Sequence, residues 1–421
     1  MLDPDTARRI TDAVDAAFDR QLQFTAELVR HPSLRAAEAS AQDLMAAQFR
    51  ERGLAVDRWT LDGEALSAHV GYGPTTVAFE DLTNVVGTYT ASEQRGRSLI
   101  LNGHIDVVPT GPEETWEHHS WDAVVEDGWM YGRGVGDMKA GLAANLFAFD
   151  AVLAAGFTPA ATIHLQSVVE EECTGNGSLA ALQRGYTADA VVIPEPEENM
   201  LVRANVGVIW FRVRVSGKPT HVREMASGFN AIDAAYTVMG ALRELETKWN
   251  SDRGNHRYFE DVDRPINLNI GMISGGDWPS SVPSWCEFDV RVALYPGISA
   301  ADAWEEIQEC LRTTDSGAAV SAERTGFFSE GYVLEEGSDA EAVLAAAHEK
   351  TFGSALQSFT TPGYLDGRVF ALYAGIPALV YGPVSESIHG FDERVHLESV
   401  RKVTKTIALF IADWCGVTEP A

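Results

Sequence analysis

The chain has 421 residues, of which 45% are hydrophobic, and this is enough for a large core and for two domains. Its 61 acidic and 32 basic residues give a formal net charge of −29, which excludes nucleic acid and anionic membranes as expected partners. No signal-peptide pattern or long apolar run occurs, so a cytoplasmic location is expected. The four cysteines show no C-x-x-C spacing, which argues against a disulfide framework or a zinc ribbon.

The first half of the chain alternates predicted helices and strands. Hydrophobic residues at helical spacing predict helices over residues 5–30, 37–53 and 140–155. Short runs of apolar and β-branched residues predict strands over residues 84–88, 99–109, 161–169 and 188–193. This alternation predicts an α/β fold with a mostly parallel sheet that is covered by helices on both faces.

From Gly207 the pattern of elements changes. We predict, in order, a strand, a helix, two strands, a helix and a strand, at residues 208–215, 229–245, 265–274, 286–294, 300–311 and 317–322. The order β-α-β-β-α-β is typical of a ferredoxin-like α+β unit. The sequence therefore predicts a first domain in two parts, residues 1–206 and 325–421, with a second domain inserted at residues 207–324.

Polar residues that could take part in catalysis or metal binding follow the predicted strands of the first domain. His104 and Asp106 lie near the end of one strand, Glu170-Glu171-Glu172 follow another, and Glu195 follows a third between two prolines. Ligands of parallel sheets gather at the carboxyl ends of the strands. Asp106 is placed to fix the tautomer of the His104 imidazole, although a plain hydrogen-bonded pair at a strand end is the simpler alternative.

Two further candidates lie in loops. Asp137 is in the glycine-rich stretch Gly132-Arg133-Gly134-Val135-Gly136, whose glycines allow backbone torsions that other residues resist, and His389 lies in a loop near the C-terminus. The combined set has a ligand charge of −3 and consists of His104, Asp137, Glu172, Glu195 and His389. Two zinc ions and one hydroxide would neutralise this charge, with Asp137 bridging the ions; cobalt or manganese would suit the same ligands.

These motifs resemble those of the co-catalytic di-zinc amidohydrolases and exopeptidases. That family includes acetylornithine deacetylase, succinyl-diaminopimelate desuccinylase, aminoacylase and bacterial glutamate carboxypeptidase. The resemblance covers nearly the whole chain and rests on the segments GHIDVVP, GRGVGDMKAG, EEECTGNGS, PEP, SGKPTH and IHG.

The resemblance implies a role for each residue of the predicted site. His104, Asp137 and Glu195 would hold one metal ion, and Asp137, Glu172 and His389 would hold the other. Glu171 would be the general base, with Glu170/Glu171 as the alternative base–ligand pair because three glutamates are adjacent. The resemblance also implies a cis peptide bond after Asp137.

The inserted domain is expected to act as a lid and a dimerisation domain. The resemblance implies that His221 reaches the active site of the partner subunit in a homodimer, although a surface histidine without a role is the alternative. Arg291 and Asn269 are tentative substrate contacts; Arg291 would clamp a carboxylate, or it would form an ordinary salt bridge at a strand edge.

The predicted function is hydrolysis of the amide bond of N-acyl amino acids by an acetylornithine-deacetylase-like deacylase. A dipeptidase or carboxypeptidase with the same di-zinc site is the first alternative. A non-hydrolytic ligand-binding protein with the same fold is a remote one, because all five ligands and the base are present. The expected partners are a small N-acyl amino acid or dipeptide and a second copy of the chain.

Overall fold

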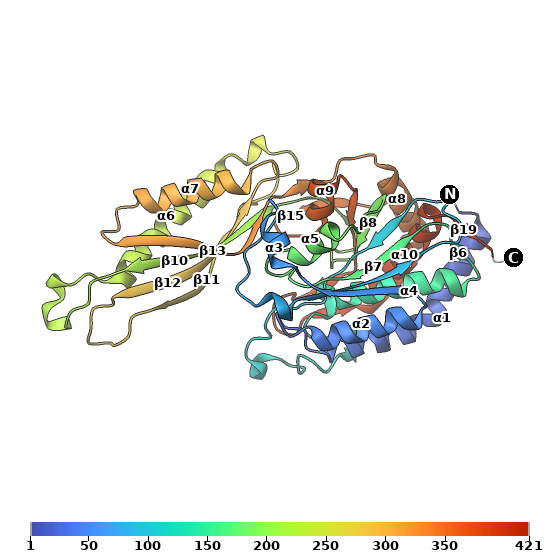
Figure 1. The fold of residues 1–421 in the computed structure, drawn as a ribbon, viewed down its shortest axis with the longest axis horizontal. Coiled ribbons are helices and arrows are strands. Elements are labelled where there is room, and N and C mark those ends of the chain that lie inside the picture. Colours follow the sequence, from blue (N-terminus) through green and yellow to red (C-terminus); the bar gives the residue numbers. More distant parts are fainter. Residues whose placement is uncertain (1, 420–421) are drawn as a thin grey trace.

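The computed structural model describes residues 2–419, which form two lobes. Figure 1 shows a larger α/β lobe that contains both ends of the chain and an elongated inserted lobe on its left. Each lobe has its own large cluster of buried hydrophobic side chains. The α/β class predicted from the alternating elements is thus confirmed.

A six-stranded sheet forms the centre of the larger lobe. Its spatial order is β1 (Ala55–Thr60), β2 (Thr83–Tyr89), β7 (Ile163–Ser167), β3 (Leu99–Leu101), β8 (Ala190–Ile193) and β16 (Ala378–Val380). The pairs β7–β3, β3–β8 and β8–β16 are parallel, whereas β1–β2 and β2–β7 are antiparallel. The sheet is therefore mostly parallel, as predicted.

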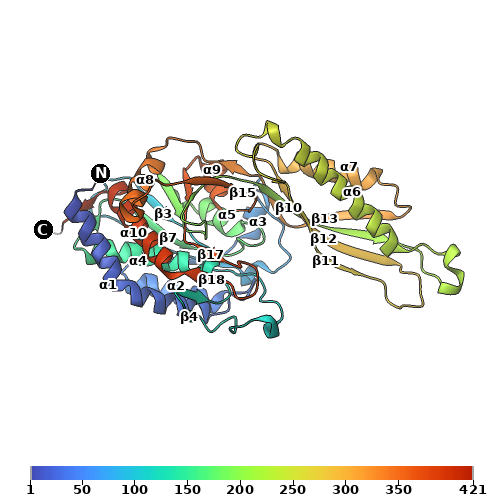
Figure 2. The same ribbon diagram turned by 180° about the vertical axis from the view of Figure 1, so that it is seen from behind.

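Helices cover both faces of this sheet. Figures 1 and 2 show one layer with α1 (Pro4–Val29), α4 (Ala140–Ala154) and α10 (Leu397–Trp414), and α5 (Asn176–Gln183) and α9 (Gly367–Ala374) lie on the opposite side. Almost every residue of α4 is buried, since it packs between α1, α10 and the sheet. Two further helices complete the lobe, α2 (Ala39–Glu51) beside β2 and α8 (Asp339–Phe352) beside α10.

The inserted lobe is a four-stranded antiparallel sheet with two helices. Its elements in chain order are β10 (Gly207–Ser216), α6 (Ala231–Ser251), β11 (Leu268–Gly275), β12 (Trp285–Leu294), α7 (Ala300–Thr313) and β13 (Ala319–Ser329). The spatial order β11-β12-β10-β13 is that of a ferredoxin-like unit, which confirms the predicted pattern. Alternate residues of β10 and β12 pack against α6 and α7, and the other face of the sheet carries no helix of the lobe.

Two predicted strand boundaries were wrong. The strand predicted over residues 99–109 ends at Leu101, because beyond that point successive backbone groups bond to different segments: the Ile105 N–H donates to Val168 O and the Val107 N–H to Ser33 O. The last strand of the inserted lobe continues to Ser329 instead of ending at residue 322, so the predicted domain boundary at residue 324 falls inside β13.

A small sheet beside the larger one connects two loops of the predicted site. Its order is β17 (Ser385–Glu386), β18 (Arg394–His396), β5 (Trp129–Tyr131) and β4 (Val124–Glu126). The β17–β18 hairpin carries His389 in its loop, and β5 leads directly into the glycine-rich stretch before Asp137. Pairing of β18 with β5 therefore brings these two segments together although they are about 250 residues apart in sequence.

Within residues 2–419, the structure contains no helix that is both long enough and apolar enough to cross a membrane.

Candidate metal centre

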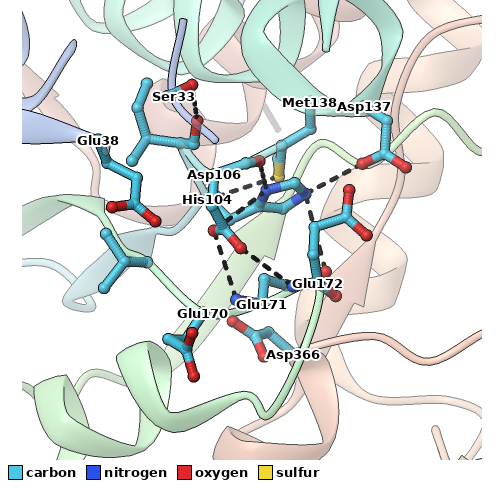
Figure 3. Close-up of polar contacts among 12 residues, drawn as sticks. Ser33, Glu38, His104, Asp106, Asp137, Met138, Glu170, Glu171, Glu172 and Asp366 are labelled. Atoms are coloured by element: carbon cyan, nitrogen blue, oxygen red, sulfur yellow. Dashed lines mark hydrogen bonds and ion pairs between the residues drawn. The ribbon is translucent and has the colours of Figure 1, made fainter. Parts of the chain in front are cut away.

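His104 lies just beyond β3 and is held in a fixed orientation. It makes a single parallel bridge to Val168, and its side chain is 1% exposed. Its Nδ1 lies 2.9 Å from the main-chain oxygen of Asp106, so Nδ1 is the donor and Nε2 is directed into the cleft. Figure 3 shows the imidazole between Asp106 on one side and Asp137 on the other.

Asp137 lies between the two histidines of the predicted set. Its Oδ1 is 3.0 Å from Nε2 of His104, and its Oδ2 is 3.4 Å from Nε2 of His389. The glycine-rich stretch turns sharply to present it: Gly134 has a φ of 74°, and a Cβ there would lie 2.3 Å from Val107 Cγ1. The Asp137–Met138 peptide bond is cis, as expected.

The three consecutive glutamates face different partners. Glu170 is fully buried and forms an ion pair with Arg35, and Figure 3 shows its carboxylate pointing away from His104. Glu172 Oε2 lies 3.1 Å from His389 Nε2, whereas Glu171 Oε2 lies 3.9 Å from His104 Nε2. This arrangement favours Glu171/Glu172 over Glu170/Glu171 as the pair at the site, because Arg35 already neutralises Glu170.

The carboxylate of Asp106 positions this segment instead of facing the cleft. Its two oxygens accept hydrogen bonds from the backbone N–H groups of Glu171 and Glu172, at 3.4 and 3.2 Å. Asp106 thus contacts His104 through its main-chain oxygen and also has its Oδ1 3.6 Å from His104 Nδ1. These contacts support a positioning role behind the cluster rather than a direct contact with substrate.

Glu195 completes the cluster at the end of β8. Its Oε1 lies 3.7 Å from His104 Nε2, and this buried oxygen has no hydrogen-bond partner among residues 2–419. A buried carboxylate oxygen without a donor is costly unless a cation satisfies it. In addition, one ligand atom each from His104, Asp137 and Glu172 lie within 4.8 Å of one another. Nitrogen and carboxylate donors without thiolate suit zinc or a similar divalent ion, so these residues fit a metal centre.

The pKa values in the cleft reflect burial first and the charges of neighbouring groups second. Burial raises the pKa of Glu171 well above its ordinary value and that of Glu195 to about 7, although His104 opposes both shifts. Burial lowers the pKa of His389, but Glu172 and Asp137 outweigh it and raise that pKa to about 11. In the absence of metal the imidazoles thus carry the positive charge that the carboxylates require.

A buried ion pair between Arg133 and Glu393 connects the loops of Asp137 and His389. The Glu393 carboxylate binds the Arg133 guanidinium and accepts backbone N–H bonds at 3.0, 3.0 and 3.1 Å from Gly134, Gly136 and Asp137. Arg133 Nη2 in turn donates to the Gly390 main-chain oxygen at 2.9 Å. No local sequence pattern predicts this pair, because its two residues are 260 positions apart.

The other predicted contacts divide into two groups. Asn269 and Arg291 of the inserted lobe line a cleft of 480 Å³ together with Asp137, Glu171 and His389. His221, in contrast, is exposed on the inserted lobe, where its Nδ1 accepts a hydrogen bond from the Arg223 N–H, and it does not line this cleft. Within one chain, the structure therefore brings Asn269 and Arg291 to the site but not His221.

This fold and this cluster of imidazoles and carboxylates define a metal-dependent hydrolase. Residues 100–413 match the sequence profile of the peptidase family M20/M25/M40, and the chain belongs to that family. The resemblance drawn from the motifs is confirmed, and with it the assignment of the chain to the enzymes that hydrolyse amide bonds.

Similar proteins cover almost the whole chain. The N-formyl-4-amino-5-aminomethyl-2-methylpyrimidine deformylase of Halalkalibacterium halodurans is 28% identical over 406 residues, with 90% of each chain covered. The succinyl-diaminopimelate desuccinylase of Stenotrophomonas maltophilia is 27% identical over 391 residues, covering 90% of this chain and 95% of the relative. Among solved structures, the dipeptidase Dug1p of Saccharomyces cerevisiae has a TM-score of 0.80 at 14% identity, covering 97% of this chain and 98% of that one.

The Arg133–Glu393 pair predicts a large loss of stability in the variant Glu393→Gln. Removal of one partner leaves a buried guanidinium without its counter-charge, which costs about 3–5 kcal/mol of unfolding free energy. Urea denaturation measures this loss. The matched control is Asp43→Asn, which removes the exposed partner of Arg58 and is expected to cost less than about 1 kcal/mol. Equal, small losses of unfolding free energy in both variants would contradict the role of Glu393 in holding the Asp137 and His389 loops together.

Proposed function

We propose that the cluster binds two zinc ions per subunit. His104, Asp137 and Glu195 would hold one ion, and Asp137, Glu172 and His389 the other, with Asp137 shared between them. The distances of Asp137 to both imidazoles and the unpartnered oxygen of Glu195 support this assignment. Each ion would have three protein ligands, which leaves coordination positions open for water and substrate, as catalysis requires.

We propose Glu171 as the general base. When bound, the ions would polarise the scissile carbonyl and lower the pKa of water. Glu171 would accept the proton of the attacking water and return it to the nitrogen of the leaving amine. Burial raises the pKa of Glu171, which makes its carboxylate a stronger base than that of an exposed glutamate.

The proposed reaction is removal of an acyl group from an N-acyl amino acid. The deformylase and the desuccinylase, which share 28% and 27% identity with this chain, both remove an acyl group from nitrogen according to their names. The environment of Arg291 is evidence that the substrate carries the carboxylate of an amino acid. Its Nη2 donates to the Pro362 main-chain oxygen at 2.9 Å, and no carboxylate of residues 2–419 forms an ion pair with it. Its remaining N–H groups are therefore free to bind a substrate carboxylate.

A dipeptidase or carboxypeptidase is the second candidate, because the same Arg291 would equally bind the terminal carboxylate of a peptide. A peptide bond and the amide bond of an acylated amino acid would both place a carbonyl at the cluster and a carboxylate near the inserted lobe.

A substrate panel with two variants tests the reaction and the base together. The zinc-loaded enzyme is expected to hydrolyse N-acetyl or N-succinyl amino acids with a higher kcat/KM than dipeptides. Glu171→Gln is expected to lower kcat by at least about 10²-fold, as loss of a general base does, while metal content stays unchanged. Glu170→Gln is the comparison, because Glu170 binds Arg35; it is expected to lower stability as a broken buried pair does, but the folded variant is expected to keep kcat within about tenfold of wild type.

Loss of activity in Glu170→Gln together with retained activity in Glu171→Gln would identify Glu170 as the base. Faster hydrolysis of dipeptides would favour the peptidase, and no hydrolysis of any amide by metal-loaded enzyme would reject both candidates.

We further propose that the active enzyme is a homodimer in which His221 of the partner subunit stabilises the oxyanion. The strand β11 is at the edge of its sheet, and it exposes Met272 and Ile273 at 64% and 55%. An exposed apolar edge strand is a surface that a second strand can cover. The cleft of one chain also lacks His221, so that a second chain would have to supply it.

Mixing of two inactive variants tests this composite site. His221→Ala and Glu171→Gln are each expected to be inactive alone. A heterodimer of the two contains one site with an intact Glu171 and an intact His221, so random reassortment would restore about a quarter of the wild-type activity. No recovery after verified subunit exchange, or full activity of a monomer in sedimentation velocity, would contradict the role of His221.

A further inference from the structure

Three aromatic side chains form one wall of the cleft that contains the metal cluster. Trp210 of β10, Phe327 of β13 and Tyr364 of the loop before α9 all line this cleft. The Trp210 and Phe327 rings meet edge to face with centroids 5.2 Å apart, and the Phe327 and Tyr364 rings lie 4.2 Å apart. Both lobes contribute to this wall, so it faces a ligand that lies between them.

The strand register places the aromatic wall directly beside the proposed carboxylate-binding group. Trp210 is opposite Arg291 in the β10–β12 pair, and Arg291 is opposite Asn269 in the β11–β12 pair. Directly opposed residues of antiparallel strands have their side chains on the same face, with Cβ atoms about 5 Å apart. Arg291, which has no carboxylate partner, and the aromatic ring of Trp210 are thus neighbours on the same face of the sheet. This face lines the cleft.

The spacing of Arg291 and Trp210 matches the carboxylate and the ring of one aromatic α-amino acid. An aromatic α-amino acid carries its carboxylate and its ring on adjacent carbon atoms, so both can be held by neighbouring side chains of one cross-strand row. An aliphatic side chain would offer Trp210 no ring to pack against, whereas aromatic rings gain from offset or edge-to-face contacts with one another.

We propose that the preferred substrates are N-acyl derivatives of aromatic amino acids, whose ring packs on Trp210 while the carboxylate binds Arg291. This inference rests on the proposed amide hydrolysis and specifies its substrate class. Trp210 is then the specificity-determining residue, Phe327 packs behind it, and Glu171 and the metal ligands act on the amide regardless of the side chain.

The direct test compares N-acetylphenylalanine, N-acetylalanine and N-acetylornithine as substrates of the wild-type enzyme. We expect kcat/KM for the phenylalanine derivative to exceed that of the other two by at least about tenfold, the discrimination that a well-packed ring provides. Trp210→Leu is expected to remove most of this preference, so that its kcat/KM values for the phenylalanine and alanine derivatives differ by less than about threefold. Trp59→Leu is the matched control, because Trp59 lies on β1 and packs on Tyr186 instead of lining the cleft.

A binding measurement separates recognition from turnover. Calorimetry with the Glu171→Gln variant is expected to show at least about tenfold tighter binding of N-acetylphenylalanine than of N-acetylalanine, a difference that Trp210→Leu in the same background removes. Equal kcat/KM and equal affinity for the aromatic and aliphatic derivatives would overturn the inference while the proposed hydrolysis stands. Failure to cleave any N-acyl amino acid would overturn both. The wild-type comparison decides the question even if Trp210→Leu does not fold.

Discussion

Repulsion between buried carboxylates is the constraint on which the site depends. Asp137, Glu171, Glu172 and Glu195 come together at the ends of the strands, with only two imidazoles to balance them. Arg35 is already paired with Glu170, and Arg291, which lines the same cleft, forms no ion pair with these carboxylates among residues 2–419. Such a concentration of negative charge in a partly buried cleft is expensive unless cations occupy it, and bound divalent ions would remove this cost. The cluster is therefore better explained by metal binding than by any role in folding.

Two other carboxylates make the geometry rigid. Asp106 accepts the N–H groups of Glu171 and Glu172, and Glu393 accepts those of three residues in the glycine-rich stretch. Each carboxylate thus fixes the backbone of a segment that presents proposed ligands. Ligands held by a second layer of hydrogen bonds need little reorganisation when an ion binds. Acidic residues around this cleft therefore fall into two groups, those that face it and those that hold the backbone behind it.

The sequence predicted much of this arrangement because most of the relevant residues mark strand ends. His104, Glu172 and Glu195 each follow a strand of the parallel sheet, and parallel strands bring their carboxyl ends to one edge. Asp137 was identifiable from the glycines around it. The alternation of elements also predicted the ferredoxin-like insertion, although β13 continues beyond the expected boundary.

Features that depend on distant contacts could not be predicted in this way. The proposal of Glu171 instead of Glu170 as the base rests on Arg35, which is 135 residues away from Glu170. The pairing of Glu393 with Arg133, and the row of Trp210 beside Arg291, depend on strand register and on β18 meeting β5. Periodicity and local motifs describe single elements, whereas these contacts join elements that are far apart along the chain.

Anomalous diffraction from crystals of the zinc-loaded protein, collected on both sides of the zinc absorption edge, tests the central claim most directly. Two anomalous peaks in each subunit are expected, one on either side of the Asp137 carboxylate, with His104 nearest to one peak and His389 nearest to the other. An empty cleft at saturating zinc, or peaks located only away from Asp137, would contradict the claim that these side chains form a two-metal centre.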